Sequence, residues 1–345
     1  MKRIILLSLF IISLSQDYPT LGSDDSFDFM TWNIEWFPKN GQATLDYVTQ
    51  IIEQTDVDII AIQELDDTDM FDQMISSLPN YSGYYESSWF AGLAYIYKTE
   101  SVEINDIYEI YTTSPYWSAF PRSPMVMDVN FRGVNYFLIN NHFKCCGDDI
   151  LDFNDESDEE KRRYNAMNLL KEYIDTNLSN KNVIVLGDLN DNIAEPSVNN
   201  VFQMILDDPE NYFFADFEIA NGSISGWSYP NWPSHLDHIL ITNELFDELV
   251  NSDVQTIKID EYLNGGWSEY DQNISDHRPV FMSLIQNLMP GDVNADDTIN
   301  ILDVVMIVQI IIGNDATVPN ADFNSDGLIN IIDVVQLILL LIDGE

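Results

Sequence analysis

Near its C-terminal end the chain repeats one pattern of residues, and the two copies are thirty positions apart. Residues 291–303 read GDVNADDTINILD, and residues 321–333 read ADFNSDGLINIID. Two copies at a fixed period indicate a duplicated structural unit. Met289 and Pro290 precede the first copy, and no Lys or Arg follows them. We therefore place a domain boundary at this point.

Each copy contains a loop whose first position is Asp292 or Asp322. Oxygen-bearing side chains occupy the first, third, fifth, ninth and twelfth positions of this loop. Calcium is held by such a ring of oxygens, to which the backbone carbonyl at the seventh position adds another. An apolar helix is expected after each loop, over residues 304–312 and 334–342. We predict two Ca²⁺ ions, with the ligands Asp292, Asn294, Asp296, Thr298, Asn300 and Asp303 in the first loop and Asp322, Asn324, Asp326, Leu328, Asn330 and Asp333 in the second.

The two loops and the helices after them resemble a type I dockerin, over residues 291–345. This resemblance implies a cohesin partner. Asp297 departs from the family, which has a glycine at the sixth loop position, as at Gly327, but Asp tolerates left-handed backbone better than most residues. Helices this apolar offer few polar positions for recognition, so attachment to another cell-surface partner is the alternative.

The N-terminus has the pattern of an exported protein. A basic start, Met1 to Arg3, leads into an apolar run from Ile4 to Leu14, which is typical of a secretory signal peptide over residues 1–15. That run is too short for a permanent membrane anchor, and no later stretch reaches about 18 uninterrupted apolar residues. We expect a secreted, extracellular protein without a transmembrane segment.

Acidic residues greatly outnumber basic ones, with 58 Asp and Glu against 14 Lys and Arg and a net charge of -44. This field repels polyanions and argues against strong nonspecific binding of nucleic acid. A nuclease remains compatible with it, because divalent cations held by carboxylates neutralise phosphates locally. Solubility in saline surroundings is the simpler interpretation of the acidity.

The two cysteines, Cys145 and Cys146, are neighbours, so the chain has no ordinary disulfide framework. A bridge between adjacent residues would be strained, since their Cα atoms are only about 3.8 Å apart. Free thiols and a strained bridge both stay open at this point.

Between Phe27 and Gln286, short apolar strands alternate with amphipathic helices, which predicts layered α/β structure. Ser157 and Glu160 predict a capping box at the start of the longest helix, after an acidic surface loop. The predicted strands are 27–34, 57–63, 94–97, 125–131, 136–140, 183–186, 238–242 and 280–285, and the predicted helices are 45–54, 70–78 and 158–177.

Six short polar segments lie in this region, and all four histidines of the chain fall within them. The segments are 31–35 (TWNIE), 62–65 (IQEL), 140–144 (NNHFK), 187–191 (GDLND), 234–238 (SHLDH) and 275–279 (SDHRP). Glu64 and Asp188 each follow an apolar strand, and Asn33 ends one. Strand ends are where sites of layered α/β proteins gather, so we predict one site for phosphate-ester hydrolysis.

The order of these segments resembles the endonuclease/exonuclease/phosphatase superfamily, over residues 27–286. This resemblance implies the deoxyribonuclease-I-like fold, a four-layer α/β/β/α sandwich, for a catalytic domain at residues 24–286. It also implies that Glu64, Asn33 and Asp276 bind Mg²⁺ or Mn²⁺. The resemblance further implies that His277 is the catalytic histidine and that Asp237 orients it. It implies that Asp188 and Asn190 position water and phosphate and that His142 contacts the scissile phosphate. Arg122 matches an arginine that a subset of the family shares.

Two further histidines are placed by strand geometry. Neighbours in a strand face opposite sides, so if Asp237 points into the site, His238 points away from it. His235 shares the face of Asp237, and we hypothesise that it contacts phosphate. No covalent nucleophile is required, because imidazole transfers protons near neutral pH and the metal withdraws charge from the phosphate.

Aromatic residues cluster in the segments 116–117, 227–232 and 267–270. Such rings stack on unpaired bases, but they also pack within loops or insert at lipid surfaces. We hypothesise an extracellular nuclease that acts on DNA or RNA. A phosphomonoesterase or a sphingomyelinase-type phosphodiesterase is the first alternative, and a non-catalytic, calcium-dependent surface-binding protein is the second.

Overall fold

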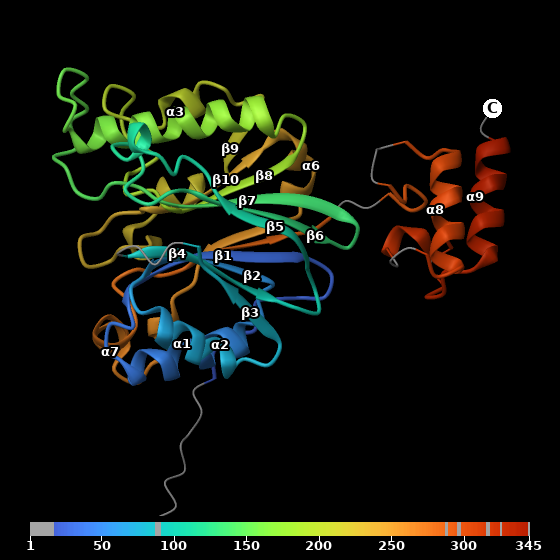
Figure 1. The fold of residues 1–345 in the computed structure, drawn as a ribbon, viewed down its shortest axis with the longest axis horizontal. Helices are drawn as coiled ribbons and strands as arrows, with labels where there is room; N and C mark the ends of the chain where they lie inside the picture. The colour runs from blue at the N-terminus through green and yellow to red at the C-terminus, as the bar shows by residue number, and fades with distance from the viewer. Residues whose placement is uncertain are drawn as a thin grey trace, which may run out of the picture.

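The computed structural model describes residues 17–86, 91–286, 289–294, 298–314, 318–324 and 326–343. The predicted signal peptide lies outside this set, as do Asp296 and Asp297. A large domain is followed by two C-terminal helices (Figure 1). Within the described ranges, no helix has both the length and the apolar character needed to cross a membrane.

Two six-stranded sheets form the centre of the large domain. The first has the order β11-β12-β1-β2-β4-β3, in which β1 is parallel to β2 and antiparallel to β12. Its strands are β1 (Phe27–Phe37), β2 (Ile59–Leu65), β3 (Tyr81–Tyr84), β4 (Gly92–Lys98), β11 (Asp253–Thr256) and β12 (Val280–Leu284).

The second sheet has the order β5-β6-β7-β8-β10-β9, with β7 parallel to β8 and β8 antiparallel to β10. Its strands are β5 (Glu103–Glu109), β6 (Met125–Phe131), β7 (Val134–His142), β8 (Asn182–Asp188), β9 (Tyr212–Phe214) and β10 (Asp237–Thr242).

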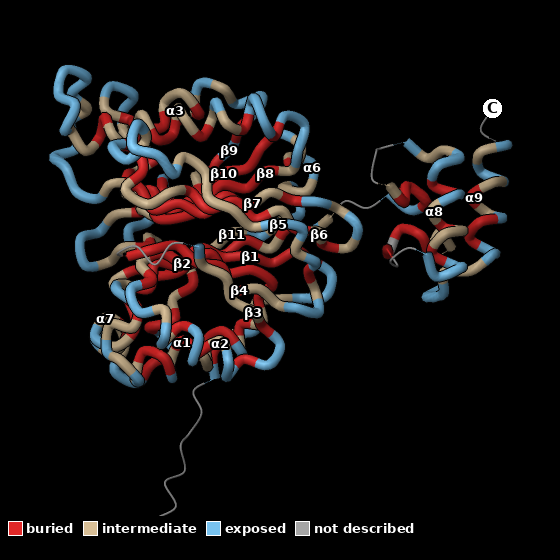
Figure 2. Tube along the Cα trace, in the orientation of Figure 1, coloured by how far each residue is buried: buried red, intermediate tan, exposed pale blue. Residues whose placement is uncertain are grey.

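The sheets pack face to face, and helices cover their outer faces (Figure 1). Apolar side chains of both sheets, such as Phe29, Leu138 and Met282, form the core between them. Helices α1 (Gln42–Thr55), α2 (Thr68–Ser76) and α7 (Gly266–Asn273) lie over the first sheet, and α3 (Glu159–Asn177) lies over the second. The buried segments coincide with these layers (Figure 2), and the predicted α/β/β/α sandwich is confirmed.

Shorter elements connect these layers. They are the helices α4 (Gln203–Leu206), α5 (Phe217–Ala220) and α6 (Phe246–Leu249) and the 3₁₀ turns η1 (Ser114–Tyr116), η2 (Ile224–Gly226), η3 (Asn243–Leu245), η4 (Ile259–Tyr262) and, in the C-terminal part, η5 (Pro319–Ala321).

The start of α3 differs from the prediction. Asp158, not Ser157, is the N-cap residue, and its Oδ1 accepts a hydrogen bond from the Lys161 N–H at 2.6 Å. The predicted capping box is therefore wrong. Glu160 instead turns its Oε1 to the N–H of Asp149, at 2.9 Å.

The C-terminal helices α8 (Ile301–Ile311) and α9 (Ile331–Asp343) pack against each other through buried side chains that include Ile307 and Leu337. Each helix begins three residues earlier than predicted, because the ninth loop residue caps it. Asn300 Oδ1 accepts from the Leu302 N–H at 2.8 Å, and Asn330 caps α9 in the same way.

The last residue of each C-terminal loop is buried and joins the two ends of its loop. Asp303 Oδ1 accepts from the Val293 N–H and its Oδ2 from the Asn300 N–H, both at 2.8 Å. Asp333 repeats this arrangement, with its Oδ2 accepting from the Asn330 N–H at 2.8 Å. The duplicated sequence therefore forms a duplicated structure.

Candidate active site

One asparagine links the two sheets at the end where the polar segments meet. Asn33, on β1, donates from Nδ2 to Glu64 Oε1 at 3.1 Å and to Asp188 Oδ2 at 3.0 Å. Glu64 belongs to the first sheet, whereas Asp188 ends β8 of the second and pairs with Asp237 of β10 and His142 of β7. The fold thus brings together residues that are far apart in the sequence.

A buried histidine and a buried aspartate form the closest ion pair of this group. His277 Nδ1 lies 2.8 Å from Asp237 Oδ2, and its Nε2 lies 3.9 Å from Asp188 Oδ2 and 3.9 Å from Asp276 Oδ1. Burial acts to lower the pKa of His277, but the charges of Asp237 and Asp188 raise it to about 10. The imidazolium is therefore stable at neutral pH, with Nε2 directed towards the carboxylates.

Burial, together with neighbouring charges, sets the charge of Asp188 and His142. Burial, together with the charges of Asp237 and Glu64, raises the pKa of Asp188 to about 7, although His277 opposes this shift. Burial and the charges of Arg122 and His277 hold the pKa of His142 well below its usual range. His142 is therefore a neutral ring, and its Nε2 lies 3.6 Å from Asp188 Oδ2 and 3.8 Å from Glu64 Oε1.

A cavity of about 740 Å³ opens over these groups. The side chains that line it include Glu64, His142, Asp188, Asp276 and His277. Among the described residues, its wall holds seven carboxylate residues, one arginine, Arg163, and the imidazolium of His277. Arg163 is itself buried against Asp191, with Nε 2.7 Å from Oδ2, so the wall has a net negative charge.

This donor set fits a divalent cation. Glu64 and Asp276 supply the hard oxygens that Mg²⁺ or Mn²⁺ prefers, and the excess of carboxylates disfavours an anionic ester without a cation. Asn33 turns its nitrogen to Glu64 in this arrangement, while its Oδ1 accepts from the Glu35 N–H at 2.9 Å. Asn33 therefore orients Glu64 here.

Asn190 and Arg122 lie at the edge of the cluster formed by His277, Asp188 and their neighbours. Asn190 has a left-handed backbone, φ 56°, and its N–H donates to Asp188 Oδ1 at 3.1 Å. Arg122 Nε donates to the Ala91 carbonyl at 3.1 Å, and Arg122 lines a neighbouring cavity of about 400 Å³ with Trp117. Burial lowers the pKa of Arg122, while the charges of Glu64 and Asp188 oppose this.

Sequence reasoning did not identify two residues that support His277. Ser275 Oγ donates to the Asn33 carbonyl at 2.6 Å and accepts from the His277 N–H at 2.9 Å. The ring of Tyr229 lies 4.7 Å from that of His277. Ser275 lies within a predicted segment, but only the tertiary contact shows what it does.

The hypothesis that His235 contacts phosphate is wrong. His235 Nε2 lies 3.0 Å from Asp216 Oδ2, its Nδ1 accepts from the Ser228 N–H at 3.2 Å, and the ring is fully buried. Strand alternation does not apply to it, because β10 begins only at Asp237. His238 points away from the cleft as predicted, with Nδ1 2.6 Å from the same Asp216 oxygen.

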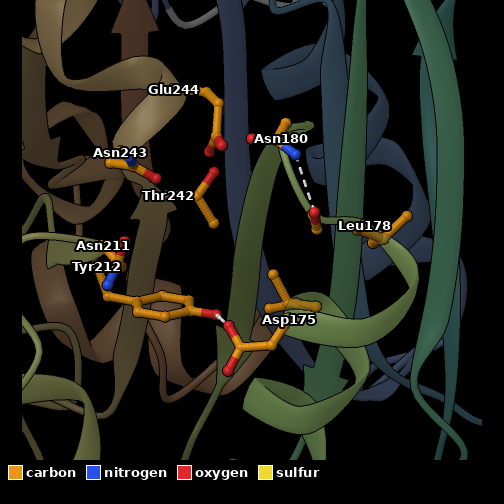
Figure 3. A pocket seen from close by; sticks show the side chains of 10 residues that line it. Asp175, Leu178, Asn180, Asn211, Tyr212, Thr242, Asn243 and Glu244 are labelled. Atoms are coloured by element: carbon orange, nitrogen blue, oxygen red, sulfur yellow. Dashed lines mark hydrogen bonds between the residues drawn. The ribbon is translucent and has the colours of Figure 1, made fainter.

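A smaller pocket, of about 210 Å³, lies at the other end of β8 and β10 (Figure 3). The Tyr212 hydroxyl donates there to Asp175 Oδ1 at 2.6 Å. None of the six polar segments contributes to its described lining, which includes Asn180, Thr242 and Glu244. The larger cavity is therefore the candidate active site.

Two facing sheets with a buried His–Asp pair at a carboxylate-rich cleft fit the phosphoesterase class. The chain belongs to the Endonuclease/Exonuclease/phosphatase family, whose profile matches residues 30–277. Residues 290–341 match the Dockerin type I domain, which binds calcium and implies a cohesin partner. Both sequence resemblances are thereby confirmed. A comparison with curated proteins found no match.

Solved structures share the fold at low identity. A humanized TDP2 of D. rerio is 14% identical with a TM-score of 0.58, and the alignment covers 76% of this chain and 100% of that one. An endonuclease/exonuclease/phosphatase from Bacteroides vulgatus is 16% identical with a TM-score of 0.51, and the alignment covers 75% of this chain and 98% of that one. The mannosyl-6-phosphatase Bt3783 of Bacteroides thetaiotaomicron is 16% identical with a TM-score of 0.51, and the alignment covers 76% of this chain and 100% of that one.

Proposed function

We propose that the large domain, residues 24–286, is a secreted nuclease that hydrolyses phosphodiester bonds with a divalent metal. The observation that carries this proposal is a pair of exposed indoles in the cleft. Trp36 is 42% exposed and Trp232 is 78% exposed, and both line the cavity that contains His277. Exposed rings beside a hydrolytic centre suit unpaired bases, each stack being worth about 1 to 3 kcal/mol.

The proposed chemistry is hydrolysis, in which a water oxygen bonds to the phosphorus, the phosphorus–oxygen bond of the leaving group breaks, and the leaving oxygen takes up a proton. Mg²⁺ or Mn²⁺, held by Glu64 and Asp276, would withdraw charge from the phosphate. Asp188, with its pKa of about 7, is suited to accept the proton of the attacking water. The sequence assigned this role to His277, but its raised pKa favours the imidazolium as a source of positive charge for the phosphate.

Supporting residues keep these groups in place. Asp237 holds Nδ1 of His277, so Nε2 faces the cleft. Asn190 orients Asp188 through its N–H, and the neutral His142 offers its ring to a phosphate oxygen. Arg122, in the adjoining cavity, lies close enough to contribute to the electrostatics of Glu64 and Asp188.

Secretion and attachment are part of the proposal. The signal peptide at residues 1–15 would export the chain, and the dockerin at residues 291–345 would attach it to a cohesin or another cell-surface partner. Exposed apolar side chains on both helices, such as Ile301 and Ile331, support an apolar partner surface.

Purified protein with Mg²⁺ should cleave single-stranded DNA or RNA faster than sphingomyelin or p-nitrophenyl phosphate. Trp36→Ala and Trp232→Ala should each raise KM for an oligonucleotide about tenfold, through the lost stacking, but leave hydrolysis of bis(p-nitrophenyl) phosphate unchanged. Phe213→Ala, at an exposed position on β9, is the matched control. Faster turnover of the monoester or the lipid would replace the nuclease by one of those activities.

The C-terminal module should be separable from catalysis. A chain that ends at Gln286 is expected to keep full hydrolytic activity, because no proposed catalytic residue lies beyond His277. The full chain should gain helix on addition of about two equivalents of calcium, since the loop aspartates repel one another without a cation. Far-UV circular dichroism of the two chains, titrated in parallel, measures this difference. An identical response from both would contradict the calcium loops.

A further inference from the structure

Three acidic side chains that the catalytic proposal does not use gather where the loop after β7 meets the start of α3. They are Asp148, Asp158 and Glu160, and one carboxylate oxygen of each lies within 4.8 Å of the others. Asp148 is exposed, whereas Glu160 is only 2% exposed. The cluster is thus open to solvent on one side and closed on the other.

One carboxylate oxygen of Glu160 lacks a hydrogen-bond donor. Glu160 Oε2 is buried and has no hydrogen-bond partner among the described residues. Its other oxygen, Oε1, accepts from the Asp149 N–H and lies 3.2 Å from Nη2 of Arg163. Buried carboxylate oxygens nearly always have a partner, because a lost interaction with water costs free energy.

Among the cluster carboxylates, the basic side chains of Arg163 and Lys161 contact only Glu160, through Arg163, in the ion pairs of the described residues. Arg163 directs its Nε to Asp191 Oδ2, at 2.7 Å. Lys161 directs its Nζ to the Phe153 carbonyl at 2.8 Å and to Glu156 Oε1 at 2.7 Å. Neither side chain neutralises Asp148 or Asp158 in the hydrogen bonds and ion pairs of the described residues.

We propose that Asp148, Asp158 and Glu160 bind a calcium ion. Calcium takes six to eight oxygen ligands in flexible geometry, so three carboxylates with water on the exposed side form a suitable set. Magnesium demands near-ideal octahedral geometry and suits this open cluster less well. The ion would also supply the positive partner that Glu160 Oε2 lacks.

The site would fasten one wall of the cleft to α3. Gly147 and Asp149, which directly flank Asp148, line the cavity that contains His277, as do Cys145 and Cys146. Gly147 has φ 121°, and a Cβ atom there would lie 2.0 Å from Glu160 Oε1, so the loop and Glu160 are already closely packed. Calcium bound at Asp148 would hold this loop in place and so keep the shape of the cleft.

The test uses the full chain and Asp148→Asn/Asp158→Asn. Asparagine is an equally good N-cap, so α3 should keep its start. Isothermal titration with calcium in saturating Mg²⁺ should show one equivalent fewer for this variant than for the unaltered chain. Asp152→Asn/Asp155→Asn, two exposed positions of the same loop, is the matched control and should lose none.

Two further variants separate the other cation sites. Asp303→Asn/Asp333→Asn should remove the calcium of the C-terminal loops and leave the proposed equivalent, and Glu64→Gln should also retain it. Calcium should protect residues 150–157 from proteolysis in the unaltered chain but not in Asp148→Asn/Asp158→Asn. An unchanged stoichiometry in that variant, or loss of the equivalent in Glu64→Gln instead, would overturn the site. None of these binding readouts depends on nuclease activity.

Discussion

Replacing His277 with Ala is expected to lower kcat by about 10²-fold or more while the domain stays folded. The imidazolium of His277 is held by Asp237 at 2.8 Å, and its Nε2 faces Asp188 across 3.9 Å. Its loss removes the positive charge closest to the buried carboxylates. Asp188→Ala should give a loss of the same order, because it removes the proposed acceptor of the water proton. Steady-state kinetics on an activated phosphodiester measures both effects.

The controls for this pair address folding and coupling. Asp175→Asn, in the pocket at the far end of β8, should keep the full rate. Circular dichroism and thermal unfolding should show folded protein in every variant. His277→Ala/Asp188→Ala should lose far less than the product of the single losses, because residues that act as a unit are not additive. Near-normal kcat in both single variants would remove these residues from the mechanism.

Exhaustive chelation with EDTA is expected to abolish hydrolysis, and Mg²⁺ or Mn²⁺ should restore it. The cleft wall carries seven carboxylate residues against one arginine and the imidazolium of His277, so an anionic ester is poorly bound without a cation. Glu64→Gln should raise the Mg²⁺ concentration needed for half-maximal rate by at least 10-fold, because the residue loses its charge but keeps its size. Metal titration of the initial rate measures this shift.

EDTA also removes calcium bound elsewhere in the chain, so its effect on those sites must be separated from its effect on the catalytic metal. The chain that ends at Gln286 lacks the C-terminal loops and should respond to EDTA in the same way. Asp46→Asn, on the exposed face of α1, should leave the metal dependence unchanged. Undiminished turnover in EDTA would exclude a metal-dependent mechanism.

The strands that the sequence predicted are the interior ones, and the strands it missed are the edges. Both ends of each sheet, β11 and β3 in the first and β5 and β9 in the second, were not predicted. β5 consists of exposed and half-buried residues without regular alternation, and β9 has only three residues. An edge strand is fixed mainly by backbone pairing to a neighbour, which leaves little pattern in its side chains.

The candidate site was predicted as a set of residue types but not as an arrangement. Glu64 and Asp188 could be placed at strand ends from the apolar runs before them. Their link through Asn33 could not, because it requires β1 of one sheet and β8 of the other to meet. The burial of His235 against Asp216 was missed for the same reason, since the two residues are 19 positions apart in irregular structure.

The sequence by itself determined the layered α/β fold and the duplicated C-terminal module, and it predicted the calcium ligands and the residues for catalysis, because apolar periodicity and ligand spacing are local properties. Only the tertiary structure decided which of these residues share a cleft and what charge each carries. The pKa of His277 is raised by Asp237 and Asp188, 40 and 89 positions away, and both are near only because the two sheets pack face to face. Burial and Coulomb interaction depend on distance in space, and separation along the chain does not reveal that distance.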